Sequence, residues 1–358
     1  MNRPIAYLAP MAAIGVATLA NAQERFELTG TRVAIYNLVG EVTVEQGRGP
    51  AVMVELTRGG ADGRALTVER GSIGGRETLR VIYPSDDIRY TTRWGRHSTE
   101  LRVREDGTFG DSDSDRRSGW RDGRRVRIGD DGEFDGRADL KILVPQGQAA
   151  EVYLAAGKLD ATGVRGTLRL DAASADVSAS GTVGALFVDV GSGNVDVRNV
   201  EGDVNLDTGS GSVNVNGVRG DVVTVDTGSG NVALATVNAG TLTIDTGSGD
   251  VDVTGATARS VRLDTGSGAV SCELLTNPDL LDVDTGSGSV TLTLPAAYGA
   301  VVDIESGSGG IDLDFPLQTR RMDRNHITGT IGDGRGTLHV DTGSGRVRVL
   351  RSQRAQSG

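Results

Sequence analysis

The pentapeptide Asp-Thr-Gly-Ser-Gly is the part of this sequence whose residue types could carry out chemistry. Exact copies start at Asp207, Asp226, Asp245, Asp264, Asp284 and Asp341. In aspartic proteases, two carboxylates face each other and share a proton. That arrangement needs two copies far apart in the sequence, whereas these copies recur every 19 or 20 residues from Asp207 to Asp284. The spacing therefore predicts a row of carboxylates and not a catalytic pair.

The repeat extends beyond the exact copies. Related segments begin at Asp171 (DAASA), Asp189 (DVGSG) and Glu305 (ESGSG), with steps of 18 to 21 residues along the series. The last exact copy follows Glu305 by 36 residues. A fixed period of this kind is typical of repeat architectures, in which a single unit is too small to fold alone.

Each repeat contains two short segments in which apolar and polar residues alternate. Examples are Val204-Asn205-Leu206 before the pentapeptide and Val213-Asn214-Val215 after it. This period indicates strands with one buried face. Two strands and two turns in about 19 residues predict one coil of a β-solenoid, whose equivalent positions stack about 4.8 Å apart. An antiparallel meander would explain the alternation but not the common phase of the repeats.

The predicted role of the pentapeptide is structural. Its two glycines permit positive φ at a corner. Its aspartate is expected to accept hydrogen bonds from backbone N–H groups just downstream, which would offset the repulsion between stacked carboxylates. We therefore predict a structural turn role for Asp207, Asp226, Asp245, Asp264, Asp284 and Asp341.

Calcium binding is the alternative role for a column of carboxylates. The chain lacks the G-G-x-G-x-D nonapeptide of calcium-binding β-rolls. No catalytic residue, cofactor or metal site is predicted. The single cysteine, Cys272, allows no internal disulfide, and alternation places it on the buried face of its strand.

Charge and the N-terminal segment indicate an exported protein that does not bind nucleic acid. The formal net charge of the 358 residues is -11, which argues against nucleic-acid partners. Residues 1–22 resemble a signal peptide, with Arg3, an apolar stretch and the sequence Ala20-Asn21-Ala22. No later segment is apolar enough to be an integral membrane segment. The predicted location is periplasmic, secreted or at the cell surface.

The predicted organisation is an all-β chain: a signal peptide (1–22), a β-rich N-terminal region of the same stack (23–150), the β-solenoid (151–350) and a tail (351–358). Residues 85–137 are rich in Asp, Arg, Gly and Ser and read as a solvated polar insertion. Alternatively, Trp94 and Trp120 anchor a contact with a partner there.

A second departure from the repeat lies between Phe315 and Ile327, and it is locally basic. A solvated loop is the simplest interpretation of this segment. The alternative is that Arg320, Arg321 and Arg324 contact an acidic polymer or protein partner.

The run of D-T-G-S-G-x-V-x-V units resembles the bacterial putative-adhesin family of β-strand-repeat proteins, whose function is unknown. "IYNLVGEVTV" (35–44) resembles the opening strand pair of that family, and "ADLKILVPQG" (138–147) the strand that leads into the repeats. "GTIGDGRGTLHVDTGSGRVRV" (329–349) resembles its closing coil. The resemblance implies a place at the cell surface or in the envelope and implies no catalytic residues.

The sequence favours a non-enzymatic envelope protein that offers a rigid scaffold to a protein or glycan partner. The alternative is a polysaccharide lyase or hydrolase on a β-helix, which needs acidic or basic side chains clustered on one sheet face. The outward positions of successive repeats are instead mixed in type: Asn205, Thr224, Thr243, Arg262 and Asp282.

Overall fold

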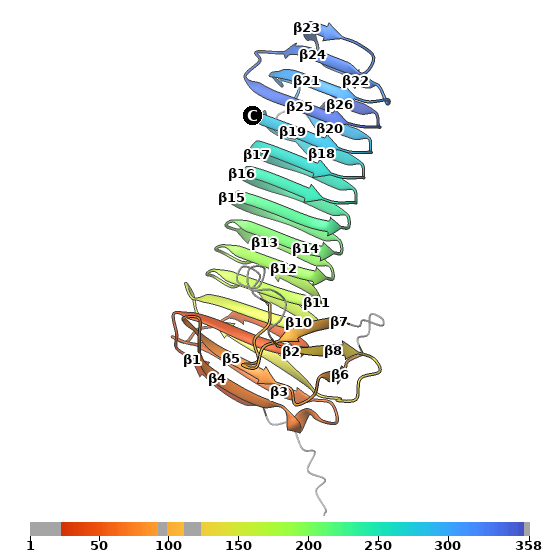
Figure 1. Ribbon diagram of the computed structural model, residues 1–358. Coiled ribbons are helices and arrows are strands. Elements are labelled where there is room, and N and C mark those ends of the chain that lie inside the picture. The colour runs from red at the N-terminus through yellow and green to blue at the C-terminus, as the bar shows by residue number, and fades with distance from the viewer. Residues whose placement is uncertain (1–22, 92–98, 111–122, 354–358) are drawn as a thin grey trace, which may run out of the picture.

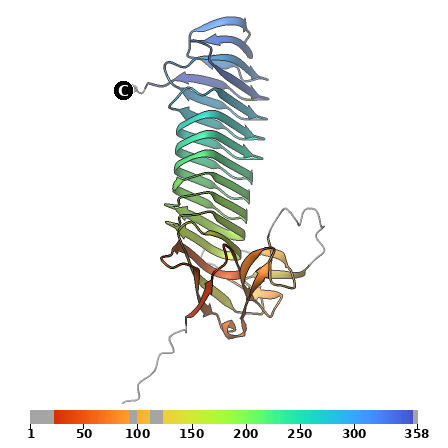
Figure 2. The same cartoon turned by 90° about the vertical axis from the view of Figure 1, so that its left-hand side faces the viewer.

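The computed structural model describes residues 23–91, 99–110 and 123–353. The predicted signal peptide (1–22) lies outside the described residues. The described chain forms an elongated stack of β-coils with a β-rich region at its N-terminal end (Figure 1). The fold is all-β and solenoid-like. Seen from the side, the coils form two sheet layers joined by bends in the longer strands (Figure 2).

The first layer, which we call the aspartate sheet, contains the strands that precede the corner formed by the pentapeptide. Its neighbours pair in parallel, except for antiparallel strands at both ends. From the N-terminal end the spatial order is β4 (Thr67–Ile73), β5 (Arg76–Ile82), the first halves of β2 (Arg32–Gln46), β10 (Ala149–Thr162) and β11 (Leu168–Ser180), β12 (Leu186–Ser192), β14 (Val204–Ser210), the second halves of β15 (Val213–Ser229), β16 (Val232–Thr246) and β17 (Val251–Thr265), β19 (Leu280–Thr285), β25 (Gly336–Thr342), β21 (Ala300–Ser306), β24 (His326–Ile331) and β23 (Leu317–Met322).

The second layer, the opposite sheet, contains the strands that follow the corner. Its order is β1 (Glu24–Leu28), β3 (Val52–Gly59), β9 (Arg137–Val144), the second halves of β2, β10 and β11, β13 (Val195–Glu201), the first halves of β15, β16 and β17, β18 (Val270–Leu274), β20 (Val290–Leu294), β26 (Val347–Arg351) and β22 (Ile311–Leu313). A short 3-10 helix, η1 (Gly63–Ala65), follows β3.

The core consists of columns of aliphatic side chains that run along the stack. Leu206, Val225 and Ile244 are opposite one another on successive strands of the aspartate sheet, and all are buried. Each such side chain contributes about 1.5–3 kcal/mol when it is buried. A lone coil would leave these columns exposed on both sides, which explains why the repeat is stable only as a stack.

Cys272 belongs to one of these columns, between Val253 and Leu292. The side chain is buried, as predicted, and burial raises the pKa of its thiol to about 12. Cys272 therefore packs as a small apolar side chain and is unreactive at neutral pH.

The resemblance of residues 329–349 to a closing coil suggested that the C-terminal coil ends the stack, but it does not. β25 pairs with β19 on one side and with β21 on the other, and β26 lies between β20 and β22 in the same way. The last part of the chain is thus inserted between two coils that precede it in sequence. The end of the stack is formed by the antiparallel strands β24 and β23 (Figure 1).

The polar insertion (85–137) is more structured in its described part than a solvated loop. β6 (Asp87–Arg89), β8 (Arg124–Gly129) and β7 (Thr99–Val103) form a small sheet. Its residues Ile88, Val126 and Ile128 are buried in the core cluster of the N-terminal region. The alternation in Arg124–Gly129 was the sequence signal for this sheet, and the many neighbouring arginines obscured it.

The last glycine of the pentapeptide sets how closely the coils approach at the corner. Gly249 has φ +145°, and a Cβ atom at this position would lie 2.1 Å from the carbonyl oxygen of Gly230. Gly230 stands in the same relation to Gly211, at 2.0 Å. Only glycine can therefore occupy this corner without separating neighbouring coils.

We expect Gly249→Ala to lower the free energy of unfolding by about 3 kcal/mol or more, because backbone strain and a clash between layers act together. Gly255→Ala is the matched control, since Gly255 also has positive φ (+66°) but nothing within 4 Å of the added Cβ. That control should lose only about 1–2 kcal/mol. Urea unfolding of both variants measures the difference, and equal losses would contradict close packing at the corner.

Candidate functional site

The aspartates of the pentapeptides form one row on the outer face of the aspartate sheet. We call this set the acidic row; in spatial order it contains Asp189, Asp207, Asp226, Asp245, Asp264, Asp284, Asp341 and Glu305. Each carboxylate is opposite the next on the neighbouring strand. The row therefore places like charges side by side along one face, and no two of its members come from opposing walls of a cleft.

Burial and neighbouring charges disfavour the charged form of three aspartates in the acidic row. The pKa of Asp226 is raised by partial burial and then by the charges of Asp207 and Asp245. The pKa of Asp264 and that of Asp284 are also raised, in each case chiefly by burial and then by neighbouring aspartates. Acid-base catalysis by two carboxylates needs environments that move their pKa values apart, and here the pKa values move in the same direction for the same reason.

In several coils the threonine hydroxyl of the pentapeptide donates a hydrogen bond to a backbone carbonyl of the neighbouring coil, which is a different contact from the one expected of the aspartate. The buried hydroxyls of Thr208 and Thr227 have no hydrogen-bond partner among the described residues. The Thr265 hydroxyl donates to the carbonyl oxygen of Gly249 at 3.1 Å, and the Thr285 hydroxyl donates to that of Gly268 at 3.2 Å. Both threonines are fully buried. Within the described residues, no side-chain hydrogen bond is found for Asp264 or Asp284. Alternation explains the difference, because the aspartate points outward and the next residue points inward beneath the corner.

The residue directly after the pentapeptide provides a second link between coils. The Asn231 side-chain oxygen accepts a hydrogen bond from the backbone N–H of Asp250 at 3.0 Å, and the Asp250 carboxylate accepts one from the N–H of Ala269 at 2.8 Å. Equivalent positions in successive coils are therefore joined by an Asx side chain. The sequence signal for this link is the Asn or Asp that directly follows several copies of the motif, and no role was predicted for it.

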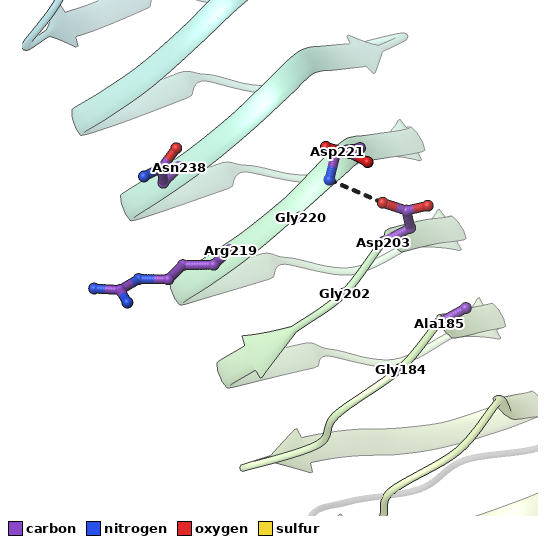
Figure 3. Close-up of a pocket in the computed structure, with 8 residues that line it drawn as sticks. All are labelled: Gly184, Ala185, Gly202, Asp203, Arg219, Gly220, Asp221 and Asn238. Atoms are coloured by element: carbon purple, nitrogen blue, oxygen red, sulfur yellow. Dashed lines mark hydrogen bonds between the residues drawn. The ribbon is translucent and has the colours of Figure 1, made fainter. Parts of the chain in front are cut away.

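The other corner of the coil carries a shallow groove of about 530 Å³ (Figure 3). It is lined by Gly184, Ala185, Gly202, Asp203, Arg219, Gly220, Asp221 and Asn238. The Asp203 carboxylate accepts hydrogen bonds from the backbone N–H groups of Asp221 and Val222, both at 3.0 Å. Asp203 thereby links two coils, which gives this groove a structural explanation.

A second hollow, of about 430 Å³, lies on the outer face of the opposite sheet. Asp196 and Arg198 line one side of this hollow. We call the part of it that is formed by Asn214, Asn216, Ala233, Ala235, Asp252 and Thr254 the amide trough. The pairing register places the two alanines between the asparagine pair on one strand and Asp252 and Thr254 on the other. The short alanine side chains form the floor, and the longer polar side chains form the two walls.

The amide trough has polar groups that are not used by the fold. Within the described residues, the Asn214 and Asn216 side chains form no hydrogen bond, whereas Thr254 is 3.4 Å from the Asp252 carboxylate. Each free amide offers both donors and an acceptor. The sequence signal for this hollow is the interruption of polar outward positions by Ala233 and Ala235, and it was not among the predicted contact sites.

The arginines predicted as partner contacts lie at the C-terminal end of the stack. Arg320 and Arg321 are on the edge strand β23, and Arg324 follows it; all three are exposed. Arg321 pairs with Asp323 at 2.5 Å. Met322 beside them is 69% exposed. The three arginines thus lie on or directly after one exposed edge strand, while Trp94 and Trp120 lie outside the described residues.

The described residues contain no group of three or more His, Cys, Asp or Glu side chains arranged to hold a metal ion. In the same part of the chain, no helix has the length and apolar character needed to span a membrane.

Residues 181–350 match the model of the family described as Toastrack DUF4097. A search of the curated proteins finds none that matches the chain. The family match concerns the stacked coils from Gly181 to Leu350, and the N-terminal region lies outside it.

Three solved structures are similar to the chain. One is a putative adhesin from Bacteroides fragilis, 9% identical, with 92% of this chain and 96% of that chain covered and a TM-score of 0.38. Another is a putative lipid binding protein from Parabacteroides distasonis, 10% identical, with 91% and 96% covered and a TM-score of 0.41. The third is a putative cell adhesion protein from Clostridium sporogenes, 9% identical, with 92% and 99% covered and a TM-score of 0.20.

The raised pKa of Asp264 leads to a pH-dependent prediction. The pKa of Asp264 is higher in the folded state than in the unfolded state. At a pH above both pKa values the Asp264 charge therefore lowers the free energy of unfolding, and this loss disappears at a pH where both states are protonated. Asp264→Asn should therefore raise the melting temperature at pH 7 and give a smaller gain near pH 3.5. Thermal melts at the two pH values measure this difference.

Asp196→Asn is the matched control, since Asp196 is paired with Arg198 at 2.6 Å on the opposite sheet. This variant should show no gain at pH 7. A loss of stability for Asp264→Asn at pH 7 would restore the predicted structural role of the aspartate.

Proposed function

We propose that the chain is a non-enzymatic, exported cell-envelope protein whose repeat stack is a rigid scaffold for binding a protein or glycan partner. The observation that carries this proposal is the amide trough. It places unused hydrogen-bonding groups on a continuous sheet, where the backbone on both sides is fixed by parallel pairing. Binding groups on a rigid sheet lose little conformational entropy when they engage a ligand.

The chemistry of the trough favours a hydroxyl-rich glycan over a hydrophobic ligand. Two amides, a hydroxyl and a carboxylate line the walls of the trough, and the alanine side chains form its floor. The ion pair of Asp196 and Arg198 lines the same hollow beside the asparagines, so its surroundings are also polar. Asparagine amides can donate to one sugar hydroxyl and accept from another. The trough is open and runs parallel to the strands, so it suits an extended glycan chain that lies along the strand direction.

The alternative function, a polysaccharide lyase or hydrolase, would use the acidic row. Carboxyl groups on adjacent and next-adjacent strands lie about 5 to 10 Å apart, which spans the separations found in glycosidases. The raised pKa of Asp226, Asp264 and Asp284 has the same sign and the same cause at each position. This uniformity supports a row of equivalent surface charges more than an acid and a base with separate roles.

Export is the part of the proposal that rests on residues 1–22. Expression of the full chain in a bacterial host, followed by fractionation and mass spectrometry, should find the protein in the envelope or medium with Gln23 at its N-terminus. An uncleaved chain that remains in the cytoplasm would contradict export.

Binding and catalysis are separated by one experiment with two readouts. The purified chain is incubated with a panel of soluble polysaccharides and with peptidoglycan, and both retention and newly formed chain ends are measured. We expect retention of the protein without new chain ends. Release of reducing or unsaturated ends would contradict the scaffold proposal and show that the protein is a polysaccharide hydrolase or lyase.

Ala233→Gln should weaken that retention at least about tenfold, because the longer side chain fills the floor of the trough. Thr243→Gln is the matched control, since it adds similar bulk at an outward position of the aspartate sheet. Equal effects of the two substitutions on retention would contradict the proposal that the amide trough is the binding surface.

A further inference from the structure

The layer formed by β25 and β26 lies between two coils that could pair directly with each other if this layer were absent. β19 and β20 lie on one side of it, and β21 and β22 lie on the other. This layer contains the last described strands of the chain, whereas both of its neighbours precede it in sequence. We call residues 336–351 the inserted coil.

The coils on either side of the inserted coil match each other in register. Val340 of the inserted coil lies opposite Val283 on one side and Ile304 on the other. In the opposite sheet, Val347 lies between Val290 and Ile311 in the same manner. Removal of the inserted coil and a shift by one strand spacing, about 4.8 Å, would therefore bring apolar residues into the same columns.

The corner chemistry is preserved by the same shift. The Thr342 hydroxyl donates to the carbonyl oxygen of Gly288 at 3.0 Å, and the Ser306 hydroxyl donates to that of Gly345 at 2.7 Å. After closure, Ser306 would face Gly288 in place of Gly345. One hydroxyl would still meet one glycine carbonyl at this corner, and the step of 21 residues from Asp284 to Glu305 fits the repeat series.

The connecting segment is long enough for either arrangement. Residues 275–279 join β18 to β19, which lie in neighbouring layers, and residues 295–299 join β20 to β21 across the inserted coil. Both connections contain five residues. A segment of this length therefore makes a one-layer step elsewhere in the same molecule.

We propose that the space between these two coils is a strand-binding slot, filled here by the inserted coil, and that this coil can leave while β21 and β22 close onto β19 and β20. The ligand class of the slot is a two-stranded repeat segment with apolar alternation around Asp-Thr-Gly-Ser-Gly. Closure shortens the stack by one layer and moves the exposed arginines of β23 toward its N-terminal end. Release of the inserted coil also frees a repeat segment of the same ligand class.

Disulfide formation in the full chain distinguishes the two arrangements, with Cys272→Val as the background. Asp284 and Asp341 are opposite each other on neighbouring strands, whereas Asp284 and Glu305 are separated by the inserted coil. Cysteines on neighbouring strands fall within the Cα separation of 4.4–6.8 Å that a disulfide needs, and cysteines two strands apart, at about 9.6 Å, do not. Asp284→Cys/Asp341→Cys therefore reports insertion, and Asp284→Cys/Glu305→Cys reports closure.

Val340→Asp should destabilise the inserted position of this coil, because it places a carboxylate at a fully buried position of that coil alone. We expect Val340→Asp to raise the rate of the 284–305 disulfide at least about tenfold, to abolish the 284–341 disulfide and to leave the remaining stack cooperative in thermal melts. Trypsin should then cut at Arg346 and Arg348 faster than it does in the chain that keeps Val340.

Val225→Asp is the matched control, since Val225 is equally buried in a layer of β15 that lies between layers on both sides. It should lose the cooperative melt without forming the 284–305 disulfide. If Val340→Asp behaves like Val225→Asp, or keeps a folded stack without the 284–305 disulfide, the slot cannot close and the proposal is wrong. Val340→Ala, a milder variant that keeps the fold, should raise the rate of the 284–305 disulfide in the same direction, and no increase would also overturn the proposal.

Discussion

Backbone contact between successive glycine corners is the constraint on which the rest of this structure depends. The last glycine of the pentapeptide leaves no room for a side chain against the neighbouring coil, since a Cβ atom added to Gly249 would lie 2.1 Å from the carbonyl oxygen of Gly230. That contact fixes both the distance and the phase of neighbouring coils. The aliphatic columns, the buried threonine hydroxyls and the Asx links all require the same phase. The pentapeptide is therefore an architectural element of the stack.

The same phase determines what the surface can do. Identical residues at one repeat position become neighbours, so the shared phase of the aspartate produces a row of like charges, in which the pKa values of Asp226, Asp264 and Asp284 are raised. Where residue types differ between repeats, the surface acquires local features instead. The amide trough arises because Ala233 and Ala235 interrupt taller polar neighbours. Function in such a stack is carried by the departures from the repeat.

Much of the fold could be predicted from the sequence, because alternation and a common period act locally. The strands around Asp207 and Asp226, the buried face of Cys272 and the row of carboxylates all follow from these two signals. The hydrogen bond from the Thr265 hydroxyl to a carbonyl of the preceding coil was not predicted, because the prediction considered side chains that accept from backbone N–H groups and not side chains that donate to carbonyls. The direction of each side chain determines which residue forms this bond, because Thr265 points inward beneath the corner and Asp264 points outward.

The position of the inserted coil could not be predicted from the repeat pattern. Residues 300–313 and 336–349 both carry that pattern, and either segment presents apolar residues to β19 and β20 in the correct register. Sequence order favoured the first segment and the structure contains the second. In the structure β24 covers β21 and β23 covers β24, and the chain then returns to the gap between β19 and β21, where β25 lies.

Distances between spin labels along one outward column test the stacked arrangement most directly. The column contains Asn205, Thr224, Thr243, Arg262, Asp282, His339 and Asp303 in spatial order. With one label fixed at Asn205, the distance should grow by about 4.8 Å per layer, and a label at His339 should be nearer than one at Asp303. Distances that do not increase in this order, or a label at Asp303 nearer than one at His339, would contradict the account.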